Sequence, residues 1–395
     1  MEKATRQHTK EHNRALVLRT IVTNNSISRA EIARITSLTR TTVSDIVADL
    51  MAEGLVSEVG VGTSLGGKNP ILLSLVEDSR FLIGLDLAQR EFLGAVFNLR
   101  GKIRFMTRQP VNNRSGKEAL DSIYEILDGL VKTSYQPIMG IGIGTPGLVN
   151  TSEGVIVNAV NLDWQNLPLA NLLEERYHLP VYVLNDSQAA AMGEYNYGEG
   201  HQEENNMIVI NARQGIGAGL IIGHQLFQGD GGFSGEIGHI VVMPQGGQRC
   251  RCGKYGCLET VASTRALLQQ ARELAIHNQG IFQETEEIDF AAILRVFGEG
   301  EPRVQKMVLD TARYMGFAIS SLIGTLNIHK IVLTGDITRF GKPWLDVVQD
   351  TVSQNTLSML AGNTRVEFGQ MGENSVILGA SAMLADNSPL FFDAR

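Results

Sequence analysis

The sequence has few cysteines, and it lacks both long apolar runs and an overall excess of basic residues. Only three cysteines occur in 395 residues, and Cys250, Cys252 and Cys257 lie within eight positions. Three cysteines this close together cannot form a disulfide framework, so a metal site is the better first hypothesis. No stretch approaches the roughly 18 continuous apolar residues of a membrane span, and the N-terminus does not resemble a signal peptide. We therefore expect a cytoplasmic protein without a membrane partner.

The charge is unevenly distributed along the chain. The formal net charge is -8, which argues against a protein that coats nucleic acid. Residues 1–40, however, carry a net charge of +5, and the remainder carries -13. A composition that is 43% apolar also allows a large core, and the length suggests two or three domains. A small basic unit attached to an acidic body is the simplest organisation.

The N-terminal segment predicts three short helices followed by a hairpin. The first helix has an apolar stripe, Ser28 and Glu31 have the spacing of a capping box, and Thr39 is an N-cap for a third helix that Gly54 ends. Two strand-like runs follow, separated by a glycine-rich stretch at 62–70. This order is typical of a helix-turn-helix with a wing. The stripes of the first and third helices are Leu18, Ile21 and Val22, and Val43, Ile46, Val47 and Leu50.

A recognition helix presents its first turn to base edges and phosphates in the major groove. Here that turn and the residues before it are small hydrogen-bonding residues and one arginine: Ser37, Thr39, Arg40, Thr41, Thr42 and Ser44. Lys68, beside Gly66 and Gly67, would contact DNA from the wing tip. The alternatives are that the serines and threonines only cap a solvated helix and that the glycines only form a turn. We expect operator DNA as a partner.

From about Phe81 the pattern becomes an alternation of strands and helices, in two similar halves. This indicates an α/β body with a cleft between the halves. The expected strands are 81–87, 91–98, 103–108, 139–144, 181–184, 207–211, 217–222 and 330–334, and the expected helices lie near 119–130, from 186, and at 263–277 and 304–326.

Four motifs in this body resemble the signatures of the ROK family of repressors and sugar kinases. They are Gly140–Gly147 (GIGIGTPG), Leu184–Ala191 (LNDSQAAA), Gly235–His239 (GEIGH) and Cys250–Glu259 (CRCGKYGCLE). The resemblance runs from about residue 10 to the C-terminus, and only the family's repressor branch has the winged helix. It implies a two-lobed, actin-like sugar-kinase fold. The expected division is a winged helix at 1–77, a first lobe at 78–200 completed by about 375–395, and a second lobe at 201–374.

The cysteine cluster supplies three soft ligands in a Cys-x-Cys-x4-Cys spacing, and His239 lies eleven residues upstream. Three thiolates and one imidazole would complete a tetrahedral structural Zn²⁺ site, which is also the family pattern. Three free buried cysteines are the alternative. Four protein ligands would leave no position for a reacting water.

A sugar pocket needs carboxylates and amides that converge from several loops. The resemblance implies that Asn185, Asp186, Glu236, His239 and Glu259 bind the sugar, with Asn161 as a weaker candidate. His239 would serve twice, with one ring nitrogen on zinc and the other facing a sugar hydroxyl. The alternative for any one of the acids is a solvated loop carboxylate.

The phosphate-binding positions depart from the pattern of the family's kinases. Asp186 stands where the kinases have the catalytic base, but Ala88, Gln89 and Arg90 replace the glycines and threonine of the first phosphate turn. Arg213 and Gln214 replace small hydroxyl residues in the second, and Thr334-Gly335-Asp336 matches the adenosine loop only in part. Side chains there would crowd the close backbone approach to phosphate. We therefore do not expect ATP as a ligand, we interpret Asp186 as a vestigial base, and we expect no enzyme.

These features together predict a transcriptional repressor that responds to a monosaccharide, with xylose or glucose as the first guesses. A homo-oligomer, either dimer or tetramer, would read a palindromic operator, and sugar would close the cleft and re-space the DNA-binding heads. Two alternatives stay open: an active ATP-dependent sugar kinase with an attached DNA-binding domain, and a repressor controlled by a protein partner.

Overall fold

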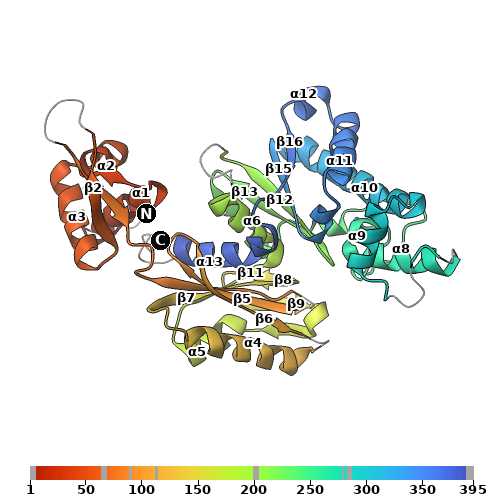
Figure 1. The fold of residues 1–395 in the computed structure, drawn as a ribbon, viewed down its shortest axis with the longest axis horizontal. Coiled ribbons are helices and arrows are strands. Elements are labelled where there is room, and N and C mark those ends of the chain that lie inside the picture. The colour runs from red at the N-terminus through yellow and green to blue at the C-terminus, as the bar shows by residue number, and fades with distance from the viewer. Residues whose placement is uncertain are drawn as a thin grey trace.

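The structure is a computed structural model that describes residues 6–63, 69–88, 91–111, 114–198, 204–277, 280–282 and 287–387. Its N-terminal part lies at one end of the molecule, in red in Figure 1. Three helices pack there against a small antiparallel sheet of order β1-β3-β2. The elements are α1 (Arg6–Thr23), β1 (Ile27–Ser28), α2 (Arg29–Thr36), α3 (Arg40–Ala52), β2 (Val56–Val61) and β3 (Ile71–Leu75).

Local hydrogen bonds fix where the second and third helices begin and end. The Ser28 hydroxyl accepts from the Glu31 N–H, and the Glu31 carboxylate accepts from the Ser28 N–H, so the predicted capping box is formed. Thr39 caps α3 by accepting from the Thr42 N–H at 3.2 Å. Gly54 follows the last turn at φ 71°, a left-handed conformation that favours glycine. The predicted helix-turn-helix is confirmed, whereas the two-residue β1 was too short for its sequence to reveal.

The body contains two five-stranded sheets. The first has the order β11-β7-β4-β5-β6 and the second the order β14-β13-β12-β15-β16. The strands of the first are β4 (Phe81–Asp86), β5 (Glu91–Asn98), β6 (Ile103–Pro110), β7 (Ile138–Thr145) and β11 (Val181–Asn185); those of the second are β12 (Met207–Ala212), β13 (Ile216–Ile222), β14 (Gln225–Phe227), β15 (Lys330–Thr334) and β16 (Arg365–Phe368). β4–β7, β7–β11, β12–β15 and β15–β16 are parallel pairs, as in an α/β fold.

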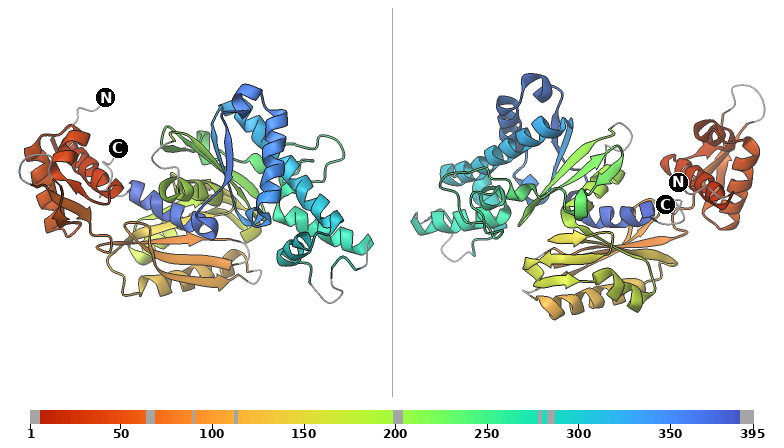
Figure 2. Two further views of the ribbon diagram at one scale, coloured as in Figure 1. Left: turned by 45° about the horizontal axis from the view of Figure 1, so that its top comes forward. Right: turned by 180° about the vertical axis from the view of Figure 1, so that it is seen from behind.

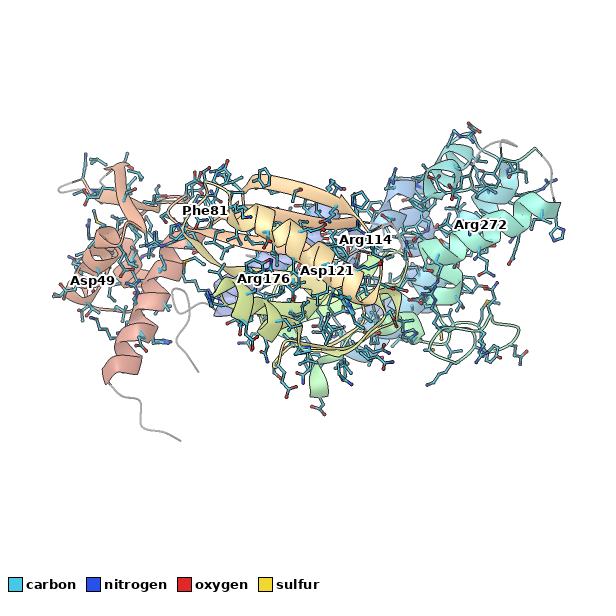
Figure 3. All side chains as sticks on the ribbon, turned by 90° about the horizontal axis from the view of Figure 1, so that it is seen from below. Asp49, Phe81, Arg114, Asp121, Arg176 and Arg272 are labelled. Carbon is cyan, nitrogen blue, oxygen red and sulfur yellow. The ribbon has the colours of Figure 1, made fainter. Side chains whose placement is uncertain are left out.

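Helices fill the space between the two sheets and cover their outer faces (Figures 1 and 2). α6 (Asp186–Tyr197) and α13 (Ser375–Asn387) lie between the sheets, and α4 (Gly116–Val131) and α5 (Leu169–Tyr177) cover the outer face of the first. Figure 3 shows the last two side by side, where Arg176 of α5 pairs with Asp128 of α4 at 2.9 Å. The second sheet's outer face carries α7 (Glu259–Ala262), α8 (Thr264–His277), α9 (Phe290–Gly298), α10 (Pro302–Leu326), α11 (Lys342–Asn355) and α12 (Ser358–Ala361).

Alternation along β12 explains why two layers of helices pack on the second sheet. Met207 and Val209 are buried in one cluster with residues of α6, and Ile208 and Ile210 are buried in another with residues of α10. Successive side chains of a strand point to opposite faces, so a strand that is apolar throughout needs a layer on each side. The α/β fold class predicted from the sequence is therefore confirmed.

Several shorter strands and turns lie between the elements of the two large sheets. A three-stranded sheet of order β10-β9-β8 and five 3₁₀ turns belong to this group. Their bounds are β8 (Leu148–Asn150), β9 (Val155–Ala159), β10 (Trp164–Leu167), η1 (Val160–Leu162), η2 (Asp230–Gly232), η3 (Ile237–His239), η4 (Asp336–Phe340) and η5 (Gly372–Asn374). Within the described residues, no helix combines the length and the apolar character needed to cross a membrane.

Candidate metal and ligand site

The three cysteines lie in one tight loop, Cys250–Cys257, which we call the knuckle. Its turn is closed by hydrogen bonds from the Cys250 N–H to the Lys254 carbonyl and from the Gly253 N–H to the Cys250 carbonyl. Gly256 has φ 72°, and a Cβ there would lie 1.8 Å from the Met243 carbonyl oxygen. Only glycine fits this close approach, so the predicted knuckle depends on it.

The knuckle and His239 bring four ligand atoms together within 4.8 Å of one another. The Cys252 and Cys257 sulfurs are 3.7 Å apart, and the Cys250 sulfur is 3.5 Å from His239 Nδ1. Tetrahedral zinc with ordinary bond lengths requires about 3.8 Å between sulfurs and about 3.6 Å between sulfur and nitrogen. Burial raises the pKa of the Cys257 thiol to about 12, so a cation is needed to hold a thiolate there. The four residues therefore fit zinc in both geometry and chemistry.

His239 connects the knuckle to a group of carboxylates. Its Nδ1 faces Cys250, and its Nε2 lies 3.8 Å from a carboxylate oxygen of Glu236. Gly235 begins this segment at φ 95°, and a Cβ there would lie 1.8 Å from the Ala218 carbonyl oxygen. The imidazole thus presents opposite edges to two different environments, as the double role predicted for it requires.

The carboxylate of Glu236 lies near those of Asp186 and Glu259. Burial, together with the charges of Asp186 and Glu259, raises the pKa of Glu236 to about 7. Glu259 begins α7, pairs with Arg265 at 2.5 Å and accepts from the Ile216 N–H at 3.3 Å. A buried carboxyl with a raised pKa beside other acids is well suited to donate and accept hydrogen bonds to a polyhydroxyl ligand.

Asn185 and Asp186 stand at the N-terminus of α6. The Asn185 side chain caps this helix by accepting from the N–H groups of Ser187 and Gln188, and it donates to the Gly147 carbonyl at 3.0 Å. Burial raises the pKa of Asp186 to about 6, although Arg213 opposes the rise. Asn185 is therefore fixed by local bonds, while Asp186 is held among charges from both sheets.

Asn161 reaches the same region from the first lobe. It lies in η1, and its side-chain oxygen accepts from Arg251 of the knuckle at 2.5 Å. The structure thus places a bond between a loop of the first lobe and the metal loop of the second. All six residues predicted to bind sugar lie on the segments that meet here.

The predicted phosphate positions are bridged by an ion pair. Arg213, after β12, donates to Asp86, at the end of β4, at 2.6 Å, and the side chains are 17% and 3% exposed. Burial raises the pKa of Asp86, which Arg213 opposes; the carboxylates of Asp86 and Asp186 raise the pKa of Arg213 against its own burial. Ala88 is partly buried, and Gln89 and Arg90 lie outside the described residues. Arg213 therefore joins the loop after β12 to Asp86 at the end of β4, the residue at which the first predicted phosphate turn begins.

The predicted DNA-contacting residues gather at the start of α3. Ser37, Thr39, Arg40, Thr41 and Ser44 are exposed, and Thr42 is half-buried beside its bond to Thr39. Ser37 has φ 56°, which makes the sharp turn between α2 and α3. Lys68 of the wing lies outside the described residues. The described surface of this helix is thus open to a groove of DNA.

Three arginine partnerships were missed by the sequence reasoning: Arg213 with Asp86, Arg251 with Asn161, and Arg265 with Glu259. The first two join residues 127 and 90 positions apart, so no local pattern could reveal them. Arg265 lies six positions after Glu259. The only indication of this pair in the sequence was that the two residues are close together along the chain.

Comparison with known proteins agrees with both parts of the fold. A family model described as ROK family matches residues 82–387, and one described as winged helix-turn-helix DNA-binding matches residues 12–57. A xylose repressor of Caldicellulosiruptor bescii is 33% identical over 385 residues, covering 95% of this chain and 96% of that protein.

Solved structures show the same architecture. A crystal structure of a ROK family transcriptional regulator, described as a homolog of the E. coli MLC protein, aligns with a TM-score of 0.84 and 25% identity, covering 97% of each chain. A ROK family glucokinase from Streptomyces griseus, in complex with glucose and AMPPNP, aligns with a TM-score of 0.70 and 28% identity over 77% of this chain and 98% of that one. The match over most of its length shows that this chain belongs to the ROK family.

Proposed function

We propose that the protein is a sugar-responsive transcriptional repressor. The observation that carries the proposal is the presence of two sites in one chain: an exposed recognition helix, and a carboxylate cluster attached to a metal-binding knuckle. The likeness to a xylose repressor extends over both parts. We keep the division expected from the sequence, with a head at 1–77, a first lobe at 78–200 and about 375–395, and a second lobe at 201–374.

The ligand of the body is proposed to be a monosaccharide, with xylose or glucose as the first candidates. Asn161, Asn185, Asp186, Glu236, His239 and Glu259 would hydrogen-bond its hydroxyls. Structural zinc on His239, Cys250, Cys252 and Cys257 would fix the imidazole and the start of α7, which supports the pocket from behind. The distances between the sulfur and nitrogen atoms support this assignment.

We infer that the protein is not a kinase, although Asp186 stands at the position of the kinase base. A proton acceptor needs a phosphoryl donor beside it, and here the nearly buried Arg213–Asp86 pair holds a guanidinium at the start of the first predicted phosphate turn. A coupled ADP-release assay with glucose, mannose, N-acetylglucosamine and xylose tests this directly. ATP turnover with any of these sugars would contradict this inference and favour the alternative, an active sugar kinase with an attached DNA-binding domain.

DNA recognition is assigned to Ser37, Thr39, Arg40, Thr41, Thr42 and Ser44, with Lys68 at the wing. A homo-oligomer, dimer or tetramer, would place two heads on a palindromic operator. The test is fluorescence anisotropy with a labelled duplex that the chain itself selects from a random-sequence pool. We expect the apparent Kd to rise at least fivefold with saturating xylose or glucose, since allosteric couplings are typically about 5- to 150-fold. Unchanged affinity across the four sugars would refute sugar control.

A further inference from the structure

The turn between β5 and β6, residues Leu99–Lys102, enters the winged-helix head. Leu99 is only 8% exposed and belongs to the buried apolar cluster of the head, together with residues of all three of its helices. The core of the head is therefore completed by a residue that the body supplies.

Arg100, the next residue of this turn, binds the end of α1. It donates to the Val22 carbonyl at 3.2 Å, to the Asn24 carbonyl at 3.4 Å and to the Ser74 hydroxyl at 3.4 Å. The last carbonyls of a helix lack partners within it and carry partial negative charge, so a guanidinium there is favourable. Arg100 thus ties the first helix and the wing strand to one point on the body.

The turn itself is rigid with respect to the first sheet. Asn98, which is fully buried, accepts from the N–H groups of Arg100 and Lys102 at 3.1 and 3.0 Å and donates to Asp78 at 2.8 Å. Its backbone also pairs with Gly101 and Lys102. Because Leu99 and Arg100 of this turn contact the head, a displacement of the turn would move the head with it.

The other side of the turn contacts α6, the helix that begins at the ligand site. Gly101 has φ 71°, and a Cβ there would lie 2.2 Å from the Tyr197 ring, so the ring rests directly on the turn. Asp186 begins the same helix and Tyr197 ends it. At about 1.5 Å per residue, the helix spans roughly 18 Å between the carboxylate cluster and the turn.

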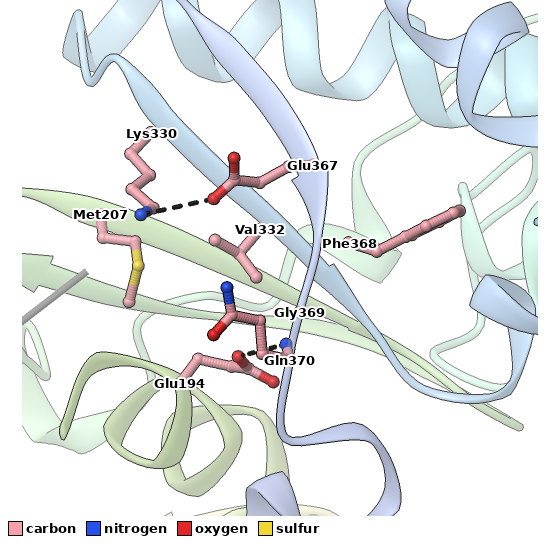
Figure 4. A pocket seen from close by; sticks show the side chains of 8 residues that line it. All are labelled: Glu194, Met207, Lys330, Val332, Glu367, Phe368, Gly369 and Gln370. Atoms are coloured by element: carbon pink, nitrogen blue, oxygen red, sulfur yellow. Dashed lines mark hydrogen bonds and ion pairs between the residues drawn. The ribbon is translucent and has the colours of Figure 1, made fainter. Parts of the chain in front are cut away.

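α6 is also bound to the loop that carries the ligand residues. Gln188 donates to the Gly232 carbonyl at 2.9 Å and to the Ser234 carbonyl at 3.4 Å, just before Glu236. Near its other end, Glu194 accepts from the Gln370 N–H at 2.9 Å (Figure 4) and from the Met371 N–H at 3.1 Å. The 232–239 segment is therefore hydrogen-bonded to the start of α6, and residues 370–371 are hydrogen-bonded near its end.

From these contacts we propose that Arg100 is the positioning residue through which the ligand site sets the orientation of the DNA-binding head. The route is the 232–239 loop, α6, the Tyr197 ring on Gly101, and the Leu99–Lys102 turn. This inference rests on the proposed function. It adds a specific coupling contact, and coupling of this kind requires that the contact differ between the two states.

The test compares Arg100→Met, which keeps the apolar stem, with Arg100→Lys, which keeps one cationic donor, and with the control Lys102→Met in the same turn. Lys102 is 57% exposed and pairs with Glu77, whose carboxylate also lies 3.9 Å from Arg100, so this control removes the neighbouring charge and keeps the bonds from Arg100 to Val22 and Asn24. For each full-length variant, anisotropy with the selected duplex gives Kd with and without D-xylose or D-glucose. Thermal shift reports sugar binding separately. Hydrogen exchange of residues 20–26 reports the α1 end without DNA.

We expect Arg100→Met to bind sugar as the wild type does but to lose most of the sugar-induced change in Kd, which is at least fivefold in the wild type. Arg100→Lys should recover part of this sugar-induced change in Kd, and Lys102→Met should match the wild type. Sugar should change the hydrogen exchange of residues 20–26 only in proteins that have arginine or lysine at position 100. Full coupling in Arg100→Met, with an unchanged exchange response, overturns the inference. A wild type that binds sugar without any effect on DNA refutes the proposed function, and the exchange response then still decides the route. A wild type that binds neither sugar refutes both.

Discussion

The knuckle end and the Arg213 end of the site are stabilised in different ways. At the knuckle end, His239 and three cysteines arise from nineteen consecutive residues, 239–257, and their ligand atoms converge on one point. At the Arg213 end, Asp86 and Arg213 come from two different sheets and meet as a nearly buried ion pair. One end is organised for a metal, and the other already contains its own cation.

Under the proposed function, this difference would let a kinase-like body recognise its ligand without catalysing phosphoryl transfer. The carboxylates that face His239 are grouped as a polyhydroxyl ligand requires, whereas the space next to Asp186 is taken by a guanidinium. A phosphate group would have to displace Arg213 and leave Asp86 buried without its partner, which is costly. Asp186 belongs to the proposed sugar pocket and also lies beside the Arg213–Asp86 pair, so the two ends of the site meet at this residue.

Loss of a metal ligand should have the largest effect. Cys257→Ser should reduce the zinc content from about one equivalent to none, and unfolding free energy should fall by about 5 kcal/mol or more, because metal-binding energy contributes to folding. Plasma emission spectrometry and thermal denaturation provide the two readouts. Lys254→Ala, an exposed change in the same loop, is the control. Full zinc content in Cys257→Ser would show that the knuckle is not a zinc site.

Breaking the ion pair at the other end should rank second. Arg213→Met leaves the buried Asp86 carboxylate without its partner and should lower the unfolding free energy by about 3–5 kcal/mol. Adding Asp86→Asn should restore part of this loss, since a neutral amide costs less to bury. Urea unfolding of the two single variants and the double variant measures the coupling. Additive effects in this cycle would mean that the pair does not join the two lobes.

A change confined to ligand recognition should be smaller. Glu259→Gln removes a charged acceptor from the proposed pocket and should weaken sugar binding about 10- to 100-fold, while operator binding without sugar stays the same. Titration calorimetry with the sugar found by thermal shift provides the measurement. The matched control is Glu273→Gln on α8, where Glu273 accepts a hydrogen bond from Gln269. An equal loss of sugar affinity in both variants would contradict the assignment of Glu259 to the sugar pocket.

The same contrast explains what could be predicted from the sequence. The knuckle, the capping box of Ser28 and Glu31, and the helix that begins at Asp186 depend on residues close together in the chain, and their patterns predicted them correctly. From the sequence, Arg213 could be recognised only as a residue that does not suit a phosphate-binding loop, because its partner Asp86 is 127 residues away. The docking of Arg100 on α1 was hidden for the same reason, with 78 residues between it and Val22.

A further prediction concerns pH, and it tests how completely Arg213 compensates Asp186. Burial raises the pKa of Asp186 from 3.8 to about 6, so the folded protein binds this proton more tightly than the unfolded chain does. Ionising Asp186 therefore costs stability progressively as pH rises from about 4 to 6, and the full cost is present above that range. Asp186→Asn, which has no such charge, should gain up to about 2–3 kcal/mol relative to wild type between pH 4 and pH 7.5.

Urea unfolding at pH 4 and at pH 7.5 measures this gain, with Asp121→Asn on the exposed side of α4 as the control (Figure 3). A gain in Asp186→Asn alone would show that Arg213 satisfies Asp86 but leaves the charge of Asp186 uncompensated. An equal difference at both pH values would contradict the raised pKa. It would mean that Arg213 neutralises both carboxylates, so that the Arg213 end is a three-member charge cluster that has replaced the chemistry of phosphate transfer.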